Sequence, residues 1–428
     1  MASFRMRRRE FLIGSAAAVA AASGAAKAAP QPRITVSSQW AAGNDGKAMD
    51  ALGKLFTDAG GAWKHNPVPG GTSGLMNKIR AEMIAKAAPA ASQLKGPEIA
   101  AWSKTYPTVD LNGIVAGAGF EALMPKEIVD LHKPFGNWIA IPAQVFRTNT
   151  LFLSKKAMEK VGENTIPKTW DDFNSLASKM QAKGIATPLA AGGLAWDHGQ
   201  KFEFALSGIS IESYRAAIMR LEDDALKGCD VLDAFKQLRR LANFWDPGAA
   251  GQHYSVLMPR FMSGDMGIIM HGGMAEGVAK FSGFSPDDYL VGNTPQNSGP
   301  PAFDLNADSF IFWQQKDEDL QEGQKLLAKT VMSPAFGPAF SGITGSIPVR
   351  SDVDMKSAAF TDNQREAARA FSEAIKNKTV ILSLGQNMAQ TAQITSAMLD
   401  VLAEFVSDKG MTAEAGQKKL VSAVADNR

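Results

Sequence analysis

An alternation of short β-rich runs with amphipathic helical stretches constrains the fold of this chain more than any other feature. Residues 33–40, RITVSSQW, form a β-rich run, and residues 46–61 carry apolar side chains at helical spacing before a Gly-Gly stop. A second amphipathic stretch, residues 74–88, ends before the segment SQLKGPE. Strands that alternate with helices form a parallel sheet covered by those helices. The sequence therefore predicts an α/β fold.

Local signals extend this pattern along the chain. Thr169 precedes a helical stretch whose first turn carries Asp171 and Asp172, which suits an N-cap and the positive end of a helix dipole. Residues 137–162 predict two extended runs that meet at Pro142, followed by a helix. A chain of 428 residues is too long for one core and long enough for two domains. We therefore expect two α/β lobes joined by short crossings.

The first 28 residues predict an export signal rather than part of the fold. Arg8 and Arg9 stand three and two residues before Phe11, which is the twin-arginine pattern, and an Ala-rich apolar stretch follows. Ala-Lys-Ala at residues 26–28 supplies small residues for cleavage, so the mature chain is expected to start near Ala29. The alternative is a basic N-terminal segment that contains two arginines by chance. The order of the three features favours the signal.

Composition excludes several classes of function. Without residues 1–28 the chain has 40 basic and 42 acidic side chains, so no charge excess favours nucleic acid. The single cysteine, Cys229, excludes an internal disulfide and a cysteine-cluster metal site. The five histidines show no metal-ligand spacing, and no flavin, haem or molybdenum signature is present. We therefore predict neither a metal nor a cofactor.

Lys95 stands at the predicted carboxyl end of a strand. Gly96 and Pro97 follow it, which ends the strand and suits the first turn of a helix. Open α/β sheets bind ligands at the carboxyl ends of their strands. Three interpretations are open for this lysine: a solvated surface charge, a catalytic group, or a group that holds a small molecule.

Aromatic and polar side chains stand near the ends of other predicted elements. Trp40 ends the first strand before an Ala-Ala-Gly turn, and an indole face can stack on the C–H face of a sugar. A core tryptophan is the alternative, but the turn favours a site. Trp196 and Asp197 lie in a Gly-rich loop, where ligand residues are common. Asn306 and Asp308 are two residues apart, so they share one face of a strand and can bond adjacent hydroxyl groups.

The ordered set of motifs resembles the substrate-binding proteins of bacterial sugar ABC importers, in particular the glucose-binding branch. The motifs are QLKGPEIAAW, PAQVFRTNTLF, IPKTWDDF, PLAAGGLAW, GIIMHGGMAEG, NADSF, GSIPVR and QNMAQT. Together they span roughly residues 34–400. The resemblance implies a two-lobed periplasmic-binding-protein fold of type II that closes around one sugar. It also implies a periplasmic monomer that docks on the membrane permease subunits of an ABC transporter.

The resemblance further implies how the mature chain divides into lobes. The N-terminal lobe is expected to comprise residues 33–142 and 306–349, and the C-terminal lobe residues 143–305 and 350–428. Crossings near Pro142, Leu305 and Arg350 are expected to act as hinges, because a few residues at element ends can absorb a lobe rotation.

A ligand site between the lobes follows from the same resemblance. The lysine of the LKGP motif is expected to bond sugar hydroxyls, with Trp40 and Trp196 as stacking platforms. Arg147 is expected to add planar paired donors. The full set of expected ligand residues is Trp40, Lys95, Arg147, Trp196, Asp197, His271, Asn306, Asp308 and Gln386.

Four positions depart from the glucose-binding pattern. Gln39 replaces one aromatic residue of a pair, and Met274 replaces a tryptophan. Thr344 stands in place of a lysine and Gln386 in place of a histidine. These changes alter the chemistry of the pocket, so glucose, a related monosaccharide, a disaccharide or a charged sugar derivative all remain open as ligands.

The alternative class is an exported enzyme such as a glycoside hydrolase. That chemistry needs two carboxylates across the scissile bond, for which Asp197, Asp308 and Glu276 are available. The sequence shows no such pairing, and it contains no nucleophile elbow, phosphate-binding loop or dinucleotide-binding motif. We therefore predict a binding protein without enzymatic activity.

Overall fold

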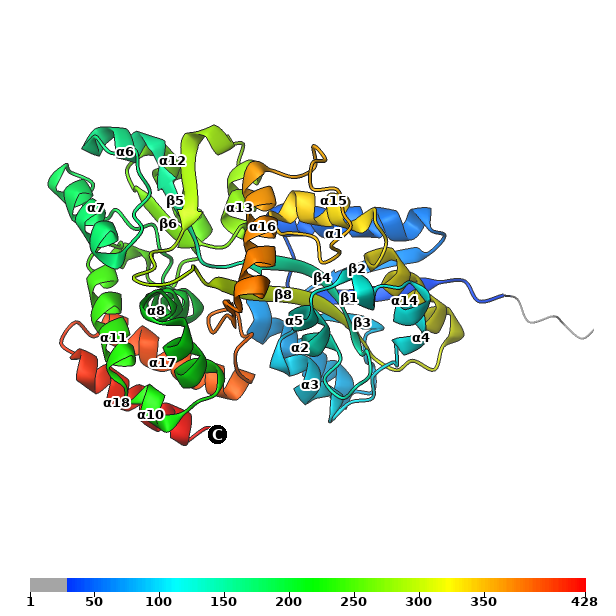
Figure 1. Ribbon diagram of the computed structural model, residues 1–428. Helices are drawn as coiled ribbons and strands as arrows, with labels where there is room; N and C mark the ends of the chain where they lie inside the picture. Colours follow the sequence, from blue (N-terminus) through cyan, green and yellow to red (C-terminus); the bar gives the residue numbers. More distant parts are fainter. Residues whose placement is uncertain (1–28) are drawn as a thin grey trace, which may run out of the picture. The chain divides into compact units, whose positions relative to one another are not determined.

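Two β-sheets organise the part of the chain that this computed structural model describes, residues 29–428 (Figure 1). The predicted export signal, residues 1–28, lies outside the described residues. The first sheet has the strand order β2-β1-β3-β8-β4, with β9 beside β8, and the second has the order β6-β5-β7. The strands are β1 Arg33–Ser38, β2 Ala62–Pro67, β3 Ala91–Lys95, β4 Ala140–Arg147, β5 Thr150–Ser154, β6 Ile268–His271, β7 Tyr289–Asn293, β8 Phe303–Phe312 and β9 Val380–Leu382.

Helices cover both sheets. The first half of the chain contributes α1 Gly43–Asp58, α2 Gly71–Ile84, α3 Pro97–Ser103, α4 Asn112–Gly117, α5 Lys126–His132, α6 Lys155–Val161, α7 Trp170–Ala182, α8 Ala195–Ile209 and α9 Ile211–Tyr214. The second half contributes α10 Asp223–Leu226, α11 Cys229–Ala242, α12 Met258–Ser263, α13 Met274–Phe281, α14 Glu318–Val331, α15 Phe336–Thr344, α16 Asp362–Asn377, α17 Ala392–Ser407 and α18 Ala413–Ala425. Short helical turns are η1 Glu121–Leu123, η2 Arg215–Met219, η3 Pro247–Ala249, η4 Tyr254–Leu257 and η5 Pro286–Asp288.

The first sheet is mixed rather than parallel throughout. Strands β1, β2 and β3 are parallel, as the alternation with helices predicts. Strand β8 runs antiparallel between β3 and β4, and it is buried along its whole length. A strand that joins the sheet about 200 residues after β3 cannot be placed from local periodicity, so the sequence did not predict its direction.

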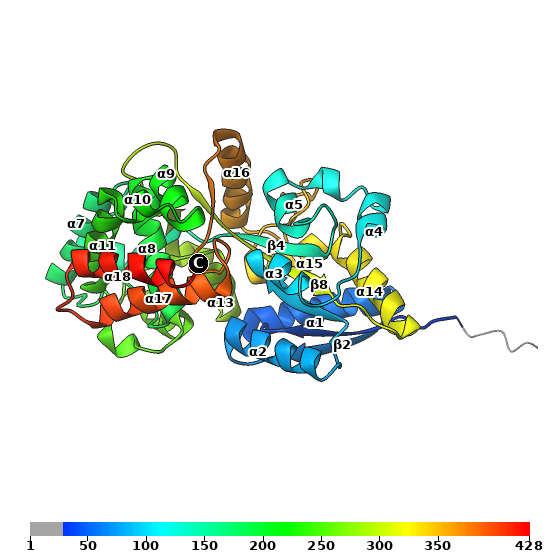
Figure 2. The same ribbon diagram turned by 90° about the horizontal axis from the view of Figure 1, so that it is seen from below.

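The second sheet is short and antiparallel. Strand β5 pairs with β6 on one side and with β7 on the other. Its side chains belong to an apolar core that α7, α8, α11 and α17 also enter. Figure 2 shows α17 and α18 beside α8 and α11, so the C-terminal helices complete this body. Within residues 29–428, no helix has the length and apolar character needed to cross a membrane.

Two local predictions are confirmed. Thr169 caps α7: its hydroxyl accepts a hydrogen bond from the Asp172 backbone N–H at 3.2 Å, and the Asp172 carboxylate accepts one from the Thr169 N–H at 3.2 Å. Pro97 occupies the first turn of α3 directly after β3. Gly96 adopts φ +56°, and a Cβ atom there would lie 2.5 Å from the Asn387 carbonyl oxygen. Only glycine fits this turn at the end of β3.

The strand pairing moves the first crossing away from Pro142. Strand β4 continues past Pro142 and stays paired with β8 as far as Arg147 opposite Leu305. The chain changes sheet at residues 148–149. There the Thr148 N–H donates to the Asp304 carbonyl oxygen at 2.8 Å, which ties this crossing to β8.

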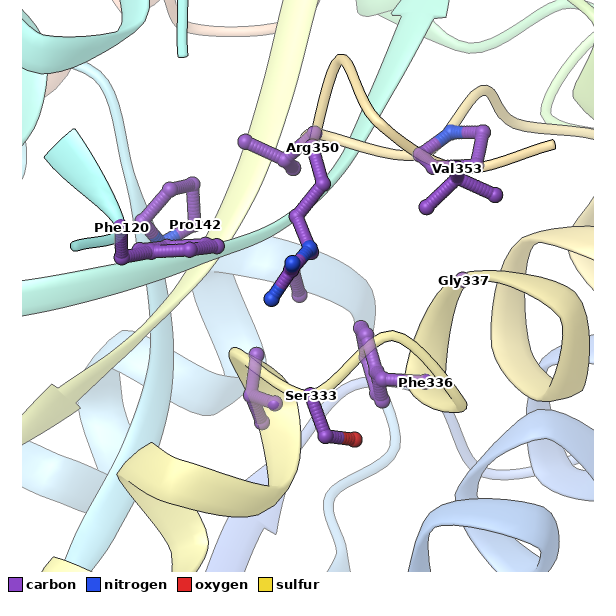
Figure 3. A pocket seen from close by; sticks show the side chains of 11 residues that line it. Phe120, Pro142, Ser333, Phe336, Gly337, Arg350 and Val353 are labelled. Carbon is purple, nitrogen blue, oxygen red and sulfur yellow. The ribbon is translucent and has the colours of Figure 1, made fainter. Parts of the chain in front are cut away.

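Arg350 is likewise packed against the first sheet rather than placed at a crossing. Figure 3 shows its side chain directed into a pocket that Phe120, Pro142 and Phe336 help to line. Beyond it, α16 places Phe371 in the core of the first sheet. Strand β9 then pairs with β8, so the third crossing follows β9, at residues 383–391.

Candidate ligand-binding site

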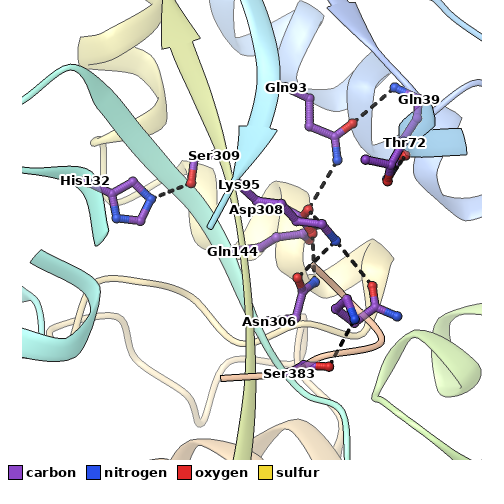
Figure 4. A network of polar contacts seen from close by, with 11 residues as sticks. Gln39, Thr72, Gln93, Lys95, His132, Gln144, Asn306, Asp308, Ser309 and Ser383 are labelled. Carbon is purple, nitrogen blue, oxygen red and sulfur yellow. Dashed lines mark hydrogen bonds and ion pairs between the residues drawn. The ribbon is translucent and has the colours of Figure 1, made fainter. Parts of the chain in front are cut away.

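Strand register gathers a set of polar side chains on one face of the first sheet. Lys95, the last residue of β3, lies directly opposite Asp308 of β8, and Gln144 of β4 lies opposite Asp308 on the other side. Residues that pair across antiparallel strands point to the same face, and so do residues two apart along one strand. Asn306 and Gln93 therefore join this face, as Figure 4 shows. We call Gln93, Lys95, Gln144, Asn306 and Asp308 the β8 cluster.

Asp308 is the hub of the β8 cluster. The side-chain amide of Gln93 donates to its Oδ1 at 3.2 Å. The amides of Gln144 and Asn306 donate to its Oδ2, each at 3.2 Å. Lys95 Nζ lies 3.6 Å from Oδ1, which makes an ion pair. Asp308 is only 3% exposed and its carboxylate is surrounded by donors, so the side chain is held in a fixed position.

Lys95 is 6% exposed, and its ammonium group is held by three acceptors. Besides Asp308, its Nζ donates to Asn306 Oδ1 at 3.1 Å and to Gln386 Oε1 at 3.2 Å. Gln386 comes from the loop after β9, 291 residues away in sequence. Four of the predicted ligand residues are therefore brought together: Lys95, Asn306, Asp308 and Gln386. The reading of Lys95 as a solvated surface charge does not hold.

The opposite face of β8 carries a different and purely structural polar contact. The His132 ring bonds the Ser309 hydroxyl through Nε2 and the Ile128 carbonyl through Nδ1. Burial lowers the pKa of this histidine to about 4, so the ring is neutral. Figure 4 shows it on the far side of the strand from Lys95.

Trp40 lies in the apolar core and not at an open strand end. Its side chain is 5% exposed. The indole packs edge-on against Phe310 at 5.8 Å and against Phe340 at 5.5 Å between ring centroids. The chain does turn after Trp40, but the indole ring packs against Phe310 of β8, which is two residues from Asp308. Trp40 is therefore a core residue that lies next to the β8 cluster, which corrects the expectation that it is poorly placed for a core.

Arg147 lies apart from the β8 cluster. It pairs with Leu305 in the β4–β8 register, and Leu305 points to the face opposite Asn306 and Asp308. Its guanidinium donates to Thr150 Oγ1 at 3.2 Å and to Asn293 Oδ1 at 2.7 Å. Arg147 therefore braces the start of the second sheet, and its predicted role as a ligand residue stays a prediction.

A second group of side chains lies at the edge of the second sheet. Trp196 at the start of α8 packs edge-on against His271 of β6, with ring centroids 5.6 Å apart. Tyr254 of η4 stacks on His271 at 3.9 Å and packs edge-on against Trp196 at 6.4 Å. The predicted residues Trp196 and His271 thus meet at an aromatic wall, which Tyr254 completes.

Asp197 forms a fully buried ion pair with Lys201, one helical turn further along α8. The pair uses only one carboxylate oxygen, and Oδ2 of Asp197 has no hydrogen-bond partner within residues 29–428. His271 is 1% exposed, and neither of its ring nitrogens reaches a partner in the same part of the chain. Burial, followed by the charge of Lys201, lowers the pKa of His271 well below its usual value, so the ring is neutral.

Asp45 is electrostatically linked to both groups, and the sequence did not predict it as a site residue. It lies in the first turn of α1, half-buried. Burial and then the charge of Asp308 raise its pKa to about 7. Burial raises the pKa of Tyr254, with smaller contributions from the charges of Asp45 and Asp197. Asp45 is therefore within electrostatic reach of both the β8 cluster and the aromatic wall. The sequence placed Asp45 only five residues after Trp40, which could have marked it as a site residue. An acidic residue in the first turn of a helix also suits the helix dipole, and this ordinary role hid it.

Glu276, the third carboxylate considered for hydrolysis, is committed elsewhere. Its Oε2 accepts hydrogen bonds from Thr361 Oγ1 at 3.0 Å and from Asn363 Nδ2 at 2.9 Å, both at the start of α16. Asp308 accepts hydrogen bonds from three amides of the β8 cluster and pairs with Lys95. The described residues also hold no group of three or more His, Cys, Asp or Glu side chains placed to bind a metal ion.

Comparison with known proteins gives one consistent family. The family model described as "Bacterial extracellular solute-binding protein" matches residues 51–368. A "Probable sugar-binding periplasmic protein" of Rhizobium meliloti is 29% identical over 419 residues, covering 97% of this chain and 99% of that protein. A protein of the same name from Brucella suis is 28% identical over 401 residues, covering 93% of each chain.

Solved structures agree on the fold. A chitin oligosaccharide binding protein superposes with a TM-score of 0.78 at 18% identity, covering 92% of this chain and 98% of that one. At this identity the likeness supports the α/β two-lobed architecture alone. Because the family model covers about three quarters of the sequence, this chain belongs to the family of bacterial extracellular solute-binding proteins.

Proposed function

We propose that this protein is the periplasmic sugar-binding component of an ABC importer, which captures a sugar and delivers it to membrane permease subunits. The observation that carries the proposal is the β8 cluster, a charged and amide-rich network buried on one face of the first sheet. Burying a charged pair is costly unless it is well bonded, and its removal in favour of apolar side chains often stabilises a protein. A role in binding a ligand would explain why the chain retains the buried pair of Lys95 and Asp308. The names of the two relatives from Rhizobium meliloti and Brucella suis support a sugar as that ligand.

The proposed ligand contacts come from both groups of side chains. Lys95, Asn306 and Asp308 suit the hydroxyl groups of a sugar, because together they offer donors and a charged acceptor in one plane of the sheet. Trp196 suits stacking on the C–H face of the ring. His271 offers one donor and one acceptor as a neutral imidazole.

The proposed lobes follow the two sheets. The N-terminal lobe contains residues 33–147 with the body of β8, and extends through α14, α15, α16 and β9. The C-terminal lobe contains the second sheet with α6 to α13, α17 and α18. The hinges are residues 148–149, the start of β8 and residues 383–391, because these segments pass between the cores of the two sheets. Closure around a sugar would bring the β8 cluster and the aromatic wall against the same ligand.

The proposed protein returns its ligand unchanged. A hydrolase of the glycosidase type needs an acid and a second carboxylate on opposite sides of one bond. Asp308 and Glu276 are each committed to donors from the protein, and Asp197 is paired with Lys201. Incubation with labelled glycosides, followed by chromatography, is expected to recover intact glycoside.

A thermal-shift screen of the mature chain over mono- and disaccharides tests the function. Binding to the folded state alone is expected to stabilise it by about 2.7 kcal/mol when the ligand is present at 100 times its Kd. The sugar that binds should therefore raise the melting temperature in a concentration-dependent way. Lys95→Met is expected to abolish this rise, because it removes the ammonium group that contacts the sugar.

Lys54→Met is the matched control for that screen. Lys54 is exposed on α1 and pairs with Asp58 at 2.8 Å, so its loss should leave the sugar response intact. A library in which no sugar shifts the melting temperature of the parent protein would contradict the proposal. Equal responses from the parent and Lys95→Met would instead place the ligand away from the β8 cluster.

A further inference from the structure

Helix α13 packs against elements of both sheets. On one face, Ala275 and Ala279 belong to the apolar core that also contains Phe152 of β5 and Ile269 of β6. Its other face lies against α1 and α15 (Figure 1). The apolar side chains of these two helices belong to the core of the first sheet. Helix α13 is therefore a place where the proposed C-terminal lobe contacts the proposed N-terminal lobe.

Two glycines form part of the face of α13 that contacts α1 and α15. Gly273 and Gly277 are four residues apart, so they lie on the same face of the helix. A Cβ atom at Gly277 would lie 2.5 Å from the Thr344 carbonyl oxygen and 2.8 Å from Asn44 Nδ2. A Cβ atom at Gly273 would overlap the Gly345 carbonyl oxygen at the end of α15. The helices approach this closely only because neither position carries a side chain.

Two further contacts join the same three helices, and neither depends on the glycines. Lys280 Nζ of α13 donates to the Gly342 carbonyl oxygen of α15 at 3.4 Å. Lys47 Nζ of α1 lies 4.7 Å from the centroid of the Phe281 ring, which is a cation–π contact. The contact surface therefore runs from the first to the last turn of α13. We call its residues the α13 seam: Gly273, Gly277, Lys280 and Phe281.

Hydrogen bonds connect the α13 seam to the β8 cluster. Thr344, whose carbonyl oxygen faces Gly277, donates from its hydroxyl to Gln144 Oε1 at 2.9 Å. Gln144 in turn donates to Asp308 at 3.2 Å. At its other end the seam adjoins the aromatic wall, because α13 begins three residues after His271 of β6. The α13 seam therefore links the two groups of side chains that the proposed sugar contacts.

We infer that docking of α13 on α1 and on the end of α15 holds the two lobes closed, and that Gly277 is the positioning residue that permits this docking. The inference rests on the proposed function and deepens it, because it names what controls closure of the same site. A ligand that touches both lobes binds the closed form. A change that lowers the closed fraction therefore weakens the apparent affinity by the same factor.

Gly277→Ala in the mature chain tests the inference, because it adds only the Cβ atom that would meet Thr344. Small-angle X-ray scattering without sugar is expected to give a larger radius of gyration for this variant than for the parent. Isothermal titration with glucose, maltose and N-acetylglucosamine gives the second measurement. Any of these sugars that the parent binds should bind the variant about tenfold more weakly, for a tenfold fall in the closed fraction.

Gly113→Ala is the matched control. Gly113 is exposed on α4, and a Cβ atom there would meet nothing within 4 Å, so the radius of gyration and the affinity should equal those of the parent. Phe281→Ala is a second variant that adds no bulk, since it removes a ring that is 48% exposed. It should shift both measurements in the same direction as Gly277→Ala. If Gly277→Ala fails to fold, Phe281→Ala decides by the same two measurements.

The outcomes separate closure from sugar binding. Equal radii of gyration for the parent, Gly277→Ala and Phe281→Ala would overturn the inference and leave the proposed function untouched. Weaker sugar binding by Gly277→Ala at an unchanged radius would also overturn it, because the loss would then come from a local distortion of the site. A larger radius in both variants would support closure by α13, even if no sugar in the library raised the melting temperature of the parent and the proposed function failed.

Discussion

Replacing Asp308 with alanine is expected to lower the free energy of unfolding by about 3–5 kcal/mol, because it leaves Lys95 as an uncompensated buried charge. Three amide donors, from Gln93, Gln144 and Asn306, would lose their shared acceptor at the same time. Sugar affinity should fall as well, by roughly ten- to a hundredfold, because the ligand's hydroxyl donors lose a charged acceptor. Urea unfolding and isothermal titration measure the two effects.

Asp130→Ala is the matched control for this change. Asp130 pairs with Lys126 at 2.5 Å on the surface of α5, where both side chains are exposed. Exposed pairs contribute at most about 1 kcal/mol, so this variant should unfold almost as the parent does. Asp308→Asn should fall between the two, because an amide keeps one acceptor oxygen. Equal stability of Asp308→Ala and Asp130→Ala would show that the β8 cluster does not hold Lys95 as described.

A loss of stability with rising pH is expected from a second buried pair, Glu203 of α8 and Asp304 of β8. Both side chains are fully buried, and Asp304 sits beside the crossing at residues 148–149. Glu203 accepts hydrogen bonds from Ser383 Oγ at 2.8 Å and from the Gly385 N–H at 2.9 Å, in the third crossing. Asp304 has no donor to either carboxylate oxygen among the described residues. A proton on Asp304, donated to Glu203, satisfies both groups.

Burial, and then the charge of Glu203, raise the pKa of Asp304 well above its usual value. Burial raises the pKa of Glu203 from 4.5 to about 7. A carboxyl group whose pKa is raised by folding binds more protons in the native state than in the unfolded state. Its contribution to stability is therefore complete below pH 4.5 and declines as the pH rises toward 7. For Glu203 the loss is about 3 kcal/mol across that window.

Asp304→Asn isolates this effect from other titrations. The amide donates to Glu203 without a titrating proton, so the variant loses the pH dependence that Asp304 contributes. Burial still raises the pKa of Glu203, so the loss of stability between pH 5 and pH 8 should be smaller than in the parent but not absent. Chemical unfolding at a series of pH values measures the difference. Glu373→Gln, an exposed carboxyl-to-amide change on α16, should follow the parent curve. Parallel curves for the parent and Asp304→Asn would contradict a shared proton at this position.

Several features followed from local sequence because they depend on neighbours a few residues apart. Strand period places Asn306 and Asp308 on one face, and the structure confirms that they touch through a 3.2 Å hydrogen bond. The Gly-Pro pair after Lys95 ends β3 and begins α3, as predicted. Thr169 also caps α7, as the sequence indicated. The resemblance of the motifs to a known family predicted the two-lobed α/β architecture.

Other features required residues that are far apart in sequence. Lys95 and Asp308 are 213 positions apart, and only the insertion of β8 between β3 and β4 makes them direct neighbours. Local periodicity carries no information on which distant strand pairs with which. The same limit explains why Tyr254 and Lys201 were missed, since each matters only through contact with His271 or Asp197.

The sequence alone thus determined which side chains stand at element ends, and the tertiary structure decided which of them face a common space. Trp40 and Arg147 both stand near strand ends, yet Trp40 packs into the core and Arg147 points to the face of the first sheet opposite Asp308. Asp45 looked like an ordinary first-turn acid, but the fold sets it within reach of Asp308 and Tyr254. The physical reason is that strand and helix periods fix a side chain's direction relative to its own element, whereas burial and electrostatic neighbours depend on how distant elements pack.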